Sequence, residues 1–348
     1  MVSSALPTTT AWTAVTDLAT PENFLSLRTH QQGERIESRL ETTAIDGLSA
    51  GEVVVRNRYA GVNYKDSLAI LGRARIIETY PRTAGIELVG EVVRSDSDRF
   101  APGQLVMAHG FRTGIAFDGG FAQFARVPAA HLMAVPQGLD ALQAATIGVP
   151  GFTAAMALDR FIAQGLTPEH GPIAVSGATG AVGMLAMQIL SQAGWRVAAM
   201  TRKMELEPVL KALGAHEVID AGGIGAQVRP LDKARFAAAI DNVGGDMLGW
   251  LLRSLSDGGQ LAVVGNAGGN DFAGNVLPFV MRNITMFGVV ANAGWPVRER
   301  VWQRLATDWR PDFAALAPHL HQIGLPELLA HAAAQLAGTT SGRTLIAL

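Results

Sequence analysis

The segment 172–183 constrains the fold of this chain more than any other, because glycines recur in it at positions 177, 180 and 183. An apolar run comes first, and helix-forming residues follow over 184–193. This order predicts a short buried strand, a tight turn and the start of a helix. Such a turn gathers unpaired backbone N–H groups and the positive end of a helix dipole around one anion. Ala178 stands where strict G-x-G-x-x-G spacing has its second glycine, so the motif alone is moderate evidence for a pyrophosphate site.

A second apolar strand, 196–200, is followed directly by Thr201, Arg202 and Lys203. In a dinucleotide-binding fold, the residues at this strand end face the adenosine ribose. An acidic residue there accepts from a free 2′-hydroxyl, whereas a basic cluster suits a 2′-phosphate. The sequence therefore predicts NADP(H) rather than NAD(H). The alternative is a pair of solvated cations at a helix start.

Composition and charge narrow the class of protein. The chain has 348 residues and a net charge of −2, so we expect two domains and no nucleic-acid partner. It has no cysteine, which excludes disulfides, thiolate metal sites and a cysteine nucleophile. Residues 1–20 lack the basic start and apolar core of a secretory signal, and 8–10 read as an extension at the start of the chain. No run of 18 uninterrupted apolar residues occurs, so we expect no membrane span and a cytoplasmic location.

Two regions differ in their pattern. Up to residue 140, short strands alternate with glycine turns, at 51–60, 87–93, 98–107 and 121–127, and this pattern predicts a barrel-like β domain. From 141 to 299, helices alternate with apolar strands, which predicts a parallel sheet with crossover helices. We expect helices at 141–146, 153–161, 184–193, 204–213 and 247–255, and strands at 173–176, 196–200, 216–219, 237–240, 260–264 and 284–290. A helix at 297–308 and a last strand at 342–348 suggest that 300–348 returns to the first domain.

Several motifs stand together in one order: GVNYKD at 61–66, GIELVG at 85–90, PGQLV at 102–106, GGFAQF at 119–124, the glycine turn, and DNVGG at 241–245. In this order they resemble the medium-chain dehydrogenase/reductase superfamily and its zinc-independent quinone oxidoreductase branch. The stretches 62–69, 151–154 and 279–283 are most similar to the acrylyl-CoA reductase group. The resemblance implies an α/β fold with a Rossmann-type doubly wound parallel sheet and a GroES-like β-barrel domain.

The resemblance also implies a cofactor and a set of residues around it. Zinc-dependent relatives use cysteine and a Gly-His-Glu histidine, but here the triplet is Gly85-Ile86-Glu87, and no metal site is expected. NADPH is expected to contact the following residues: Thr153, Gly177, Gly180, Ala181, Val182, Thr201, Arg202, Lys203, Asn242, Gly265, Ala267, Val289, Ala291 and Arg343. Arg343 is assigned to a cofactor phosphate, and its alternative is a solvated C-terminal cation.

The expected reaction is hydride transfer to the β-carbon of an activated C=C bond, as in acrylyl-CoA or another α,β-unsaturated carbonyl. Asn63 is the candidate that stabilises the enolate oxygen, with a backbone N–H as the alternative. Tyr64 is the candidate that orients the substrate or donates the α-proton. Packing against the nicotinamide is the alternative for Tyr64, and water is the alternative proton donor. We expect Lys65 and Asp66 to form an ion pair and cap at the start of a helix.

The identity of the acceptor stays open. Arg73 and Arg75 suit CoA phosphates, but the apolar stretch 111–120 leaves room for smaller enones or for quinones. The rival functions are an NADPH:quinone oxidoreductase and a low-turnover NADPH-binding protein. Family resemblance also predicts a homodimer, in which the segment 284–290 is either an exposed sheet edge or an ordinary core strand.

Overall fold

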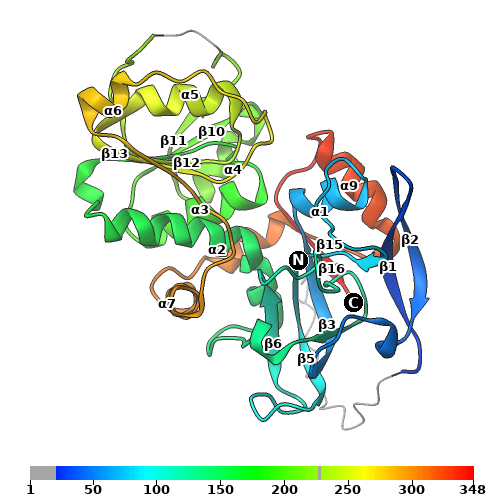
Figure 1. Cartoon of the computed structure of the whole chain (residues 1–348). Coiled ribbons are helices and arrows are strands. Elements are labelled where there is room, and N and C mark those ends of the chain that lie inside the picture. The colour runs from blue at the N-terminus through cyan, green and yellow to red at the C-terminus, as the bar shows by residue number, and fades with distance from the viewer. Residues whose placement is uncertain (1–20, 226–228) are drawn as a thin grey trace, which may run out of the picture.

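A six-stranded parallel sheet occupies the middle of the chain (Figure 1), and its strands lie in the order β11-β10-β9-β12-β13-β14. The structure is a computed structural model that describes residues 21–225 and 229–348, so the predictions for 1–20 lie outside the described residues. The strands of this sheet are β9 (Ile173–Val175), β10 (Val197–Thr201), β11 (Ala215–Asp220), β12 (Phe236–Asp241), β13 (Leu255–Val263) and β14 (Thr285–Gly288). The strand order reverses between β9 and β12, which is the doubly wound topology that the helix–strand alternation predicts.

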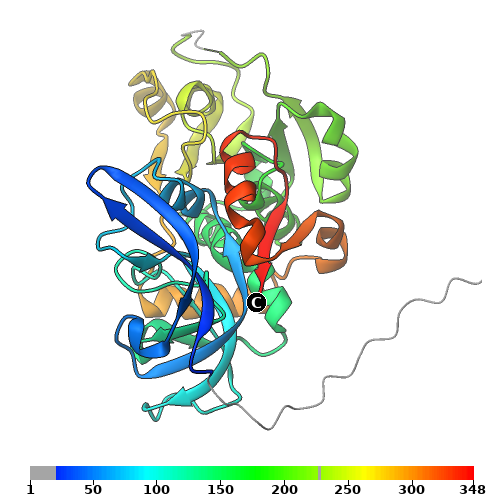
Figure 2. The same ribbon diagram turned by 90° about the vertical axis from the view of Figure 1, so that its right-hand side faces the viewer.

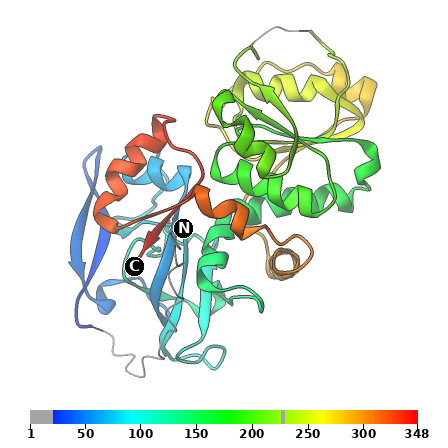
Figure 3. The same ribbon diagram turned by 180° about the vertical axis from the view of Figure 1, so that it is seen from behind.

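Helices cover both faces of this sheet (Figures 1 and 3) because its strands are apolar on both sides. In β9, Ile173 and Val175 face one core and Ala174 faces the other. The first core contains residues of α2 (Ala141–Ala163), α3 (Ala181–Gln192) and α7 (Trp295–Ala306), and the second contains residues of α5 (Gly245–Ser254). The carboxyl ends of all six strands therefore share one edge, where their following loops meet.

The remaining strands form a barrel-like domain. A seven-stranded sheet has the order β15-β16-β3-β5-β6-β8, with β7 paired to β3, and a three-stranded sheet has the order β2-β1-β4. Their bounds are β1 (Phe24–Gln32), β2 (Arg35–Thr43), β3 (Val53–Val62), β4 (Arg82–Thr83), β5 (Glu87–Ser95), β6 (Leu105–His109), β7 (Phe124–Val127), β8 (Leu132–Ala134), β15 (Leu320–Ile323) and β16 (Arg343–Ala347). The C-terminal strand β16 pairs antiparallel with β3 (Figure 2), so the end of the chain does return to the first domain.

Short helices connect these strands. They are α1 (Tyr64–Ile70), α4 (Glu207–Ala212), α6 (Leu277–Arg282), α8 (Phe313–Leu316), α9 (Leu328–Leu336) and the 3-10 turns η1 (Ile45–Gly47), η2 (Ala129–His131), η3 (Pro168–His170), η4 (Met204–Leu206), η5 (Ala317–His319) and η6 (Leu325–Glu327). Helices α1 and α9 lie side by side on the barrel domain (Figures 1 and 3), and residues of both share one apolar core.

The structure corrects some predicted bounds. The helices expected at 141–146 and 153–161 are the two arms of α2, which kink at Gly148, where φ is 44° and ψ is −154°. The helix expected at 204–213 begins with the 3-10 turn η4 and continues as α4. Strand β14 is shorter than predicted and lies at the edge of its sheet.

Helix α2 is the one helix among the described residues that is long and apolar enough to cross a membrane. Its most apolar 18-residue window is 72% buried inside the protein, which is typical of a core helix. The pairing of β16 with β3 supports a division into 1–140 with 300–348 and 141–299, which we retain as a proposal.

Candidate functional site

The glycine turn between β9 and α3 has the shape that an anion site needs. Gly177 has a φ of +58°, a conformation that favours glycine. A Cβ at Gly183 would lie 2.4 Å from the Gly177 carbonyl oxygen, so only glycine permits this close packing. At Gly180 a Cβ would meet no protein atom nearer than 3.5 Å, which leaves space above the backbone. Ala181 and Val182 begin α3, and their N–H groups have no carbonyl partner within the helix.

Polar side chains join this turn to the end of β12. The Asp241 carboxylate accepts hydrogen bonds from Ser176 Oγ at 2.6 Å and from the Gly244 N–H at 2.9 Å. The Asn242 side chain donates to the Ser176 carbonyl at 2.7 Å. Burial raises the pKa of Asp241, and these donors oppose the increase. The network fixes Asn242 beside the glycine turn, where the sequence predicts a contact with the adenosine ribose.

The basic segment after β10 lies next to the same turn, because β10 pairs with β9. Thr201 ends β10 and is buried, and its Oγ1 accepts from the Lys203 N–H at 2.9 Å. Arg202 is exposed, whereas the Lys203 ammonium donates to the Thr340 carbonyl at 2.9 Å. Of these two cations, Arg202 is therefore the one whose charged group is more available to bind a phosphate.

The other predicted cofactor residues lie at the ends of β13 and β14 or on α2. Gly265 follows β13, and a Cβ there would lie 2.5 Å from the Asn242 carbonyl oxygen, while Ala267 is exposed. The Val289 N–H donates to the Val263 carbonyl at 2.9 Å, which places Ala291 just beyond this edge of the sheet. Thr153 lies on α2 and its hydroxyl donates to the Val149 carbonyl at 2.7 Å.

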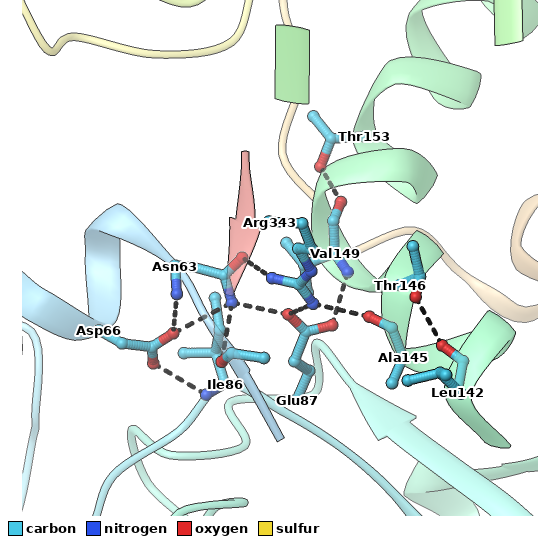
Figure 4. Close-up of polar contacts among 11 residues, drawn as sticks. Asn63, Asp66, Ile86, Glu87, Leu142, Ala145, Thr146, Val149, Thr153 and Arg343 are labelled. Atoms are coloured by element: carbon cyan, nitrogen blue, oxygen red, sulfur yellow. Dashed lines mark hydrogen bonds and ion pairs between the residues drawn. The ribbon is translucent and has the colours of Figure 1, made fainter. Parts of the chain in front are cut away.

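Asn63 and Arg343 meet around Glu87 although they are far apart in sequence (Figure 4). Glu87 opens β5 and is 5% exposed. Its Oε1 accepts from Arg343 Nη2 at 2.7 Å and from Asn63 Nδ2 at 2.8 Å, and its Oε2 accepts from the Val149 N–H at 2.7 Å. The Arg343 guanidinium also donates to the Ala145 carbonyl at 2.9 Å, so the cluster joins both domains.

Asp66 extends this cluster from the first turn of α1. Its Oδ2 accepts from the backbone N–H and from Nδ2 of Asn63, both at 3.0 Å, and its Oδ1 accepts from the Ile86 N–H at 2.9 Å. Burial raises the pKa of Asp66 to about 7, the hydrogen bonds from Asn63 lower it, and the negative charge of Glu87 raises it further. The cluster thus holds two carboxyl groups around one amide and one guanidinium.

These contacts correct three predictions. Arg343 is 4% exposed and its charge faces Glu87, so it is not a solvated cation, and we no longer assign it to a cofactor phosphate. Asp66 caps α1 as predicted, but in the described part of the chain no ion pair joins it to Lys65, since adjacent helix residues point apart. Asn63 turns its amide N–H groups toward two carboxylates, which leaves no free side-chain donor for an enolate.

Tyr64, Arg73 and Arg75 lie on α1 or in the segment that follows it. Tyr64 is the first residue of α1 and is half-buried, and its hydroxyl has no hydrogen-bond partner among residues 21–225 and 229–348. Arg73 and Arg75 are exposed in the segment after α1. Sequence reasoning did not assign a role to Glu87, although a carboxylate among the buried positions of a strand was the signal that could have found it.

The donor set does not fit a zinc ion. The chain has no cysteine, and no group of three or more His, Asp or Glu side chains within the described residues is placed to hold a metal. No step below is derived through a metal.

The chain is similar to known oxidoreductases over almost its whole length. Family models match twice: an alcohol dehydrogenase GroES-like domain at 49–137 and a zinc-binding dehydrogenase at 181–307. The acrylyl-CoA reductase AcuI of Ruegeria pomeroyi is 35% identical over 93% of this chain and 98% of its own. Solved structures with a TM-score of 0.88 include Escherichia coli YhdH with bound NADPH, which is 36% identical over 92% of this chain and 99% of its own. They also include Bacillus subtilis yhfP with NAD bound, which is 34% identical over 94% of this chain and 99% of its own. The chain belongs to the medium-chain dehydrogenase/reductase superfamily, in the acrylyl-CoA reductase group.

Proposed function

We propose that this protein is a zinc-independent, NADPH-dependent reductase of an activated C=C bond, with acrylyl-CoA or a related α,β-unsaturated carbonyl as acceptor. One observation carries the proposal. The Gly342 N–H donates to the Thr179 carbonyl in the glycine turn at 2.9 Å, and the next residue, Arg343, binds Glu87 in the cluster with Asn63. The glycine turn proposed for the cofactor phosphates is therefore adjacent to this polar cluster, so a cofactor bound at the turn lies where the two domains meet.

NADPH rather than NADH is supported by the end of β10. Thr201, Arg202 and Lys203 stand where an NAD-binding chain carries an acid for the ribose 2′-hydroxyl. The space above Gly180 and the first N–H groups of α3 suit the pyrophosphate. Bound here, the cofactor supplies a hydride to the β-carbon of the acceptor.

The residues of the chain have supporting parts in this reaction. Asn63, held by Asp66 and Glu87, fixes the start of α1 and so the position of Tyr64. The Tyr64 hydroxyl, free of other partners among the described residues, orients the acceptor carbonyl or gives the α-proton to the enolate carbon, with water as the alternative donor. Thr153 and the segment around Val289 and Ala291 border the nicotinamide.

A CoA thioester as the acceptor rests on the similarity to AcuI and on Arg73 and Arg75, which are exposed near α1. Arg112 forms an ion pair with Glu78 in the same region, so its charge is already matched. We expect Arg73 and Arg75 to contact CoA phosphates and to be dispensable for an enone that lacks CoA.

The proposed assembly is a homodimer paired through β14. This strand is the edge of the six-stranded sheet, and four apolar side chains around it are more than 60% exposed: Val276, Val280, Met281 and Val290. An unpaired edge with exposed apolar neighbours is a template for pairing with a second copy. The predicted cytoplasmic location stays a prediction.

The test is NADPH oxidation against acrylyl-CoA, crotonyl-CoA, a simple enone and two quinones. Turnover of acyl-CoA substrates, with a KM that rises in Arg73→Ala and Arg75→Ala while the KM for the enone is unchanged, supports the proposal. Turnover of quinones alone selects the quinone oxidoreductase function. Tight NADPH binding without any turnover selects the NADPH-binding protein.

Tyr64→Phe lowers turnover without changing the NADPH dissociation constant if the hydroxyl takes part.

A further inference from the structure

Arg298 is a buried cation for which the described residues supply no ionic partner. It lies on α7 and is 1% exposed, and no carboxylate of the described residues forms an ion pair with it. Burial lowers its pKa to about 10, so it is charged at neutral pH. It also stands in the first turn of a helix, where the dipole disfavours a positive charge. A buried charge without an ionic partner is costly, so stability alone does not explain this residue.

The guanidinium is used to join two separate backbone segments. Nη1 donates to the His109 carbonyl at 2.9 Å, and Nη2 donates to the Ala293 carbonyl at 3.2 Å. Its carbon lies 4.5 Å from the centroid of the Phe111 ring. His109 ends β6 in the barrel domain, whereas Ala293 follows the last strand of the cofactor domain. Arg298 therefore links the two domains from the inside.

His109 adds a second link between the same segments. Trp302 Nε1 donates to His109 Nε2 at 2.8 Å, and Arg298 Nη1 lies 2.9 Å from His109 Nδ1. This imidazole also hydrogen-bonds to the Ala291 backbone. Burial and the charge of Arg298 hold the pKa of His109 well below its usual range, so the ring stays neutral.

The turn after β6 has a backbone shaped to fit these contacts. Gly110, Phe111 and Arg112 all have positive φ, at 72°, 46° and 63°. A Cβ at Gly110 would lie 2.7 Å from Arg298 Nη2 and 3.0 Å from the Ala291 carbonyl oxygen. The Phe111 N–H donates to Asn292 Oδ1 at 3.1 Å. A run of residues in a rarely populated conformation persists only when its surroundings determine it, and such runs concentrate at functional sites.

These contacts reach Ala291, Asn292 and Ala293 and so hold the adjoining segment 289–292, which lies at one half of the cofactor sheet. The basic adenosine end follows β10, on the side of β9, β10 and β11. Residues 289–292 follow β14, on the opposite side of the point where the strand order reverses. A dinucleotide bound across that point puts its nicotinamide on the β12-β13-β14 side.

We propose that Arg298 and His109 are positioning residues that hold 289–292, and so the nicotinamide ring, in the geometry for hydride transfer, without contributing to the adenosine end. This inference rests on the proposed binding of NADPH. A misplacement of the ring by about 1 Å is enough to slow transfer by up to about a hundredfold.

The experiment compares Arg298→Met and His109→Phe with the wild type. The dissociation constants of NADPH and of 2′,5′-ADP are measured by titration, and hydride transfer is followed in single turnovers at saturating NADPH with an acceptor that the wild type reduces. We expect transfer to slow by about tenfold to a hundredfold in both variants. We expect the affinity for 2′,5′-ADP, which has no nicotinamide, to be unchanged, and the ratio of the two dissociation constants to shift.

His109→Gln is the conservative variant, because its amide oxygen can accept from Trp302 and its N–H can donate to the Ala291 carbonyl. We expect it to retain most of the transfer rate. Arg253→Met is the matched control, since Arg253 is also buried but pairs with Asp232 at 2.7 Å. It is expected to lower the unfolding temperature and to leave transfer unchanged.

The inference is overturned if Arg298→Met and His109→Phe weaken NADPH and 2′,5′-ADP equally, or if transfer is as fast as in the wild type. It is also overturned if His109→Gln is as slow as His109→Phe. If the wild type reduces no acceptor, the proposed function is wrong, but the two dissociation constants can still be measured. In that case, the inference is overturned if the ratio of the dissociation constants of NADPH and 2′,5′-ADP is the same in the variants as in the wild type.

Discussion

At the scale of single residues, the cluster around Glu87 is short of positive charge. Asp66 and Glu87 carry two carboxyl groups, and the Arg343 guanidinium contacts Glu87 but not Asp66. Like charges close together in a buried site disfavour double ionisation. Asp66, the more buried of the two and not paired with the arginine, is the group that retains its proton most easily.

Asp66 should therefore make stability depend on pH. Its pKa is about 7 in the folded protein and 3.8 for the ordinary group, so between these values the folded protein holds a proton that the unfolded chain has released. The free energy of unfolding consequently falls as pH rises through this window, by up to about 4 kcal/mol from this group. Asp66→Asn has no carboxyl group at this position, so this pH dependence of the free energy of unfolding is lost. The hydrogen bonds that the variant loses lower its free energy of unfolding by the same amount at every pH.

Denaturant unfolding of the wild type and of Asp66→Asn at several pH values checks this prediction. The free energy of the variant minus that of the wild type is expected to increase from pH 4 to pH 8. Parallel curves for the two proteins would show that Asp66 is ionised throughout. Titration of the carboxyl group by NMR gives an independent midpoint.

Arg202 is the residue on which cofactor choice should depend most. Its side chain is exposed, whereas the Lys203 ammonium already donates to Thr340. We expect Arg202→Ala to raise the dissociation constant of NADPH by roughly ten- to a hundredfold and to spare NADH, from the loss of about 1.5–3 kcal/mol per phosphate contact. Fluorescence titration with both cofactors measures this. An equal loss for both would make Arg202 structural.

At the scale of elements, the glycine turn separates two uses of glycine. Gly183 lets α3 pack against the turn, because a Cβ there would lie 2.4 Å from the Gly177 carbonyl oxygen. Gly180 has an ordinary φ of −85° and space above it, so the fold itself would accept a side chain there. Gly183 is therefore needed for folding, and Gly180 for the approach of the ligand.

Two alanine variants test this separation. Gly183→Ala is expected to lower the free energy of unfolding by about 1–3 kcal/mol through overpacking. Gly180→Ala is expected to keep the stability of the wild type and to weaken NADPH, because its methyl group occupies the space for the pyrophosphate. Thermal unfolding and cofactor titration on both proteins decide it. A stable Gly183→Ala, or a Gly180→Ala that binds normally, contradicts this assignment.

The elements show which features a sequence can and cannot predict. The parallel sheet was predictable because each of its strands is a short apolar run between helices, and β9, β10 and β12 match their predicted positions closely. The kink at Gly148 was not predictable from the sequence. It lies beside the Val149 N–H, which donates to Oε2 of Glu87, a residue far away in the sequence. The resemblance assigns Arg343 to a phosphate, and the sequence alone does not indicate its partners Asn63 and Glu87, because they lie more than 250 residues away.

At the scale of the whole molecule, the surface around β14 is where we propose that a second copy pairs. Val280 and Met281 are 73% and 63% exposed on α6 beside this edge strand, so replacing them removes little from the folded monomer. We expect the double variant Val280→Glu/Met281→Glu to keep the unfolding temperature of the monomer and to shift self-association toward monomer, because paired copies would bring like charges together. Ile162→Glu, at an exposed apolar position on α2, is the control and should leave assembly unchanged. Sedimentation velocity over a range of concentrations measures all three proteins. A wild type that is monomeric throughout, or a double variant that associates as the wild type does, would exclude this surface as the dimer interface.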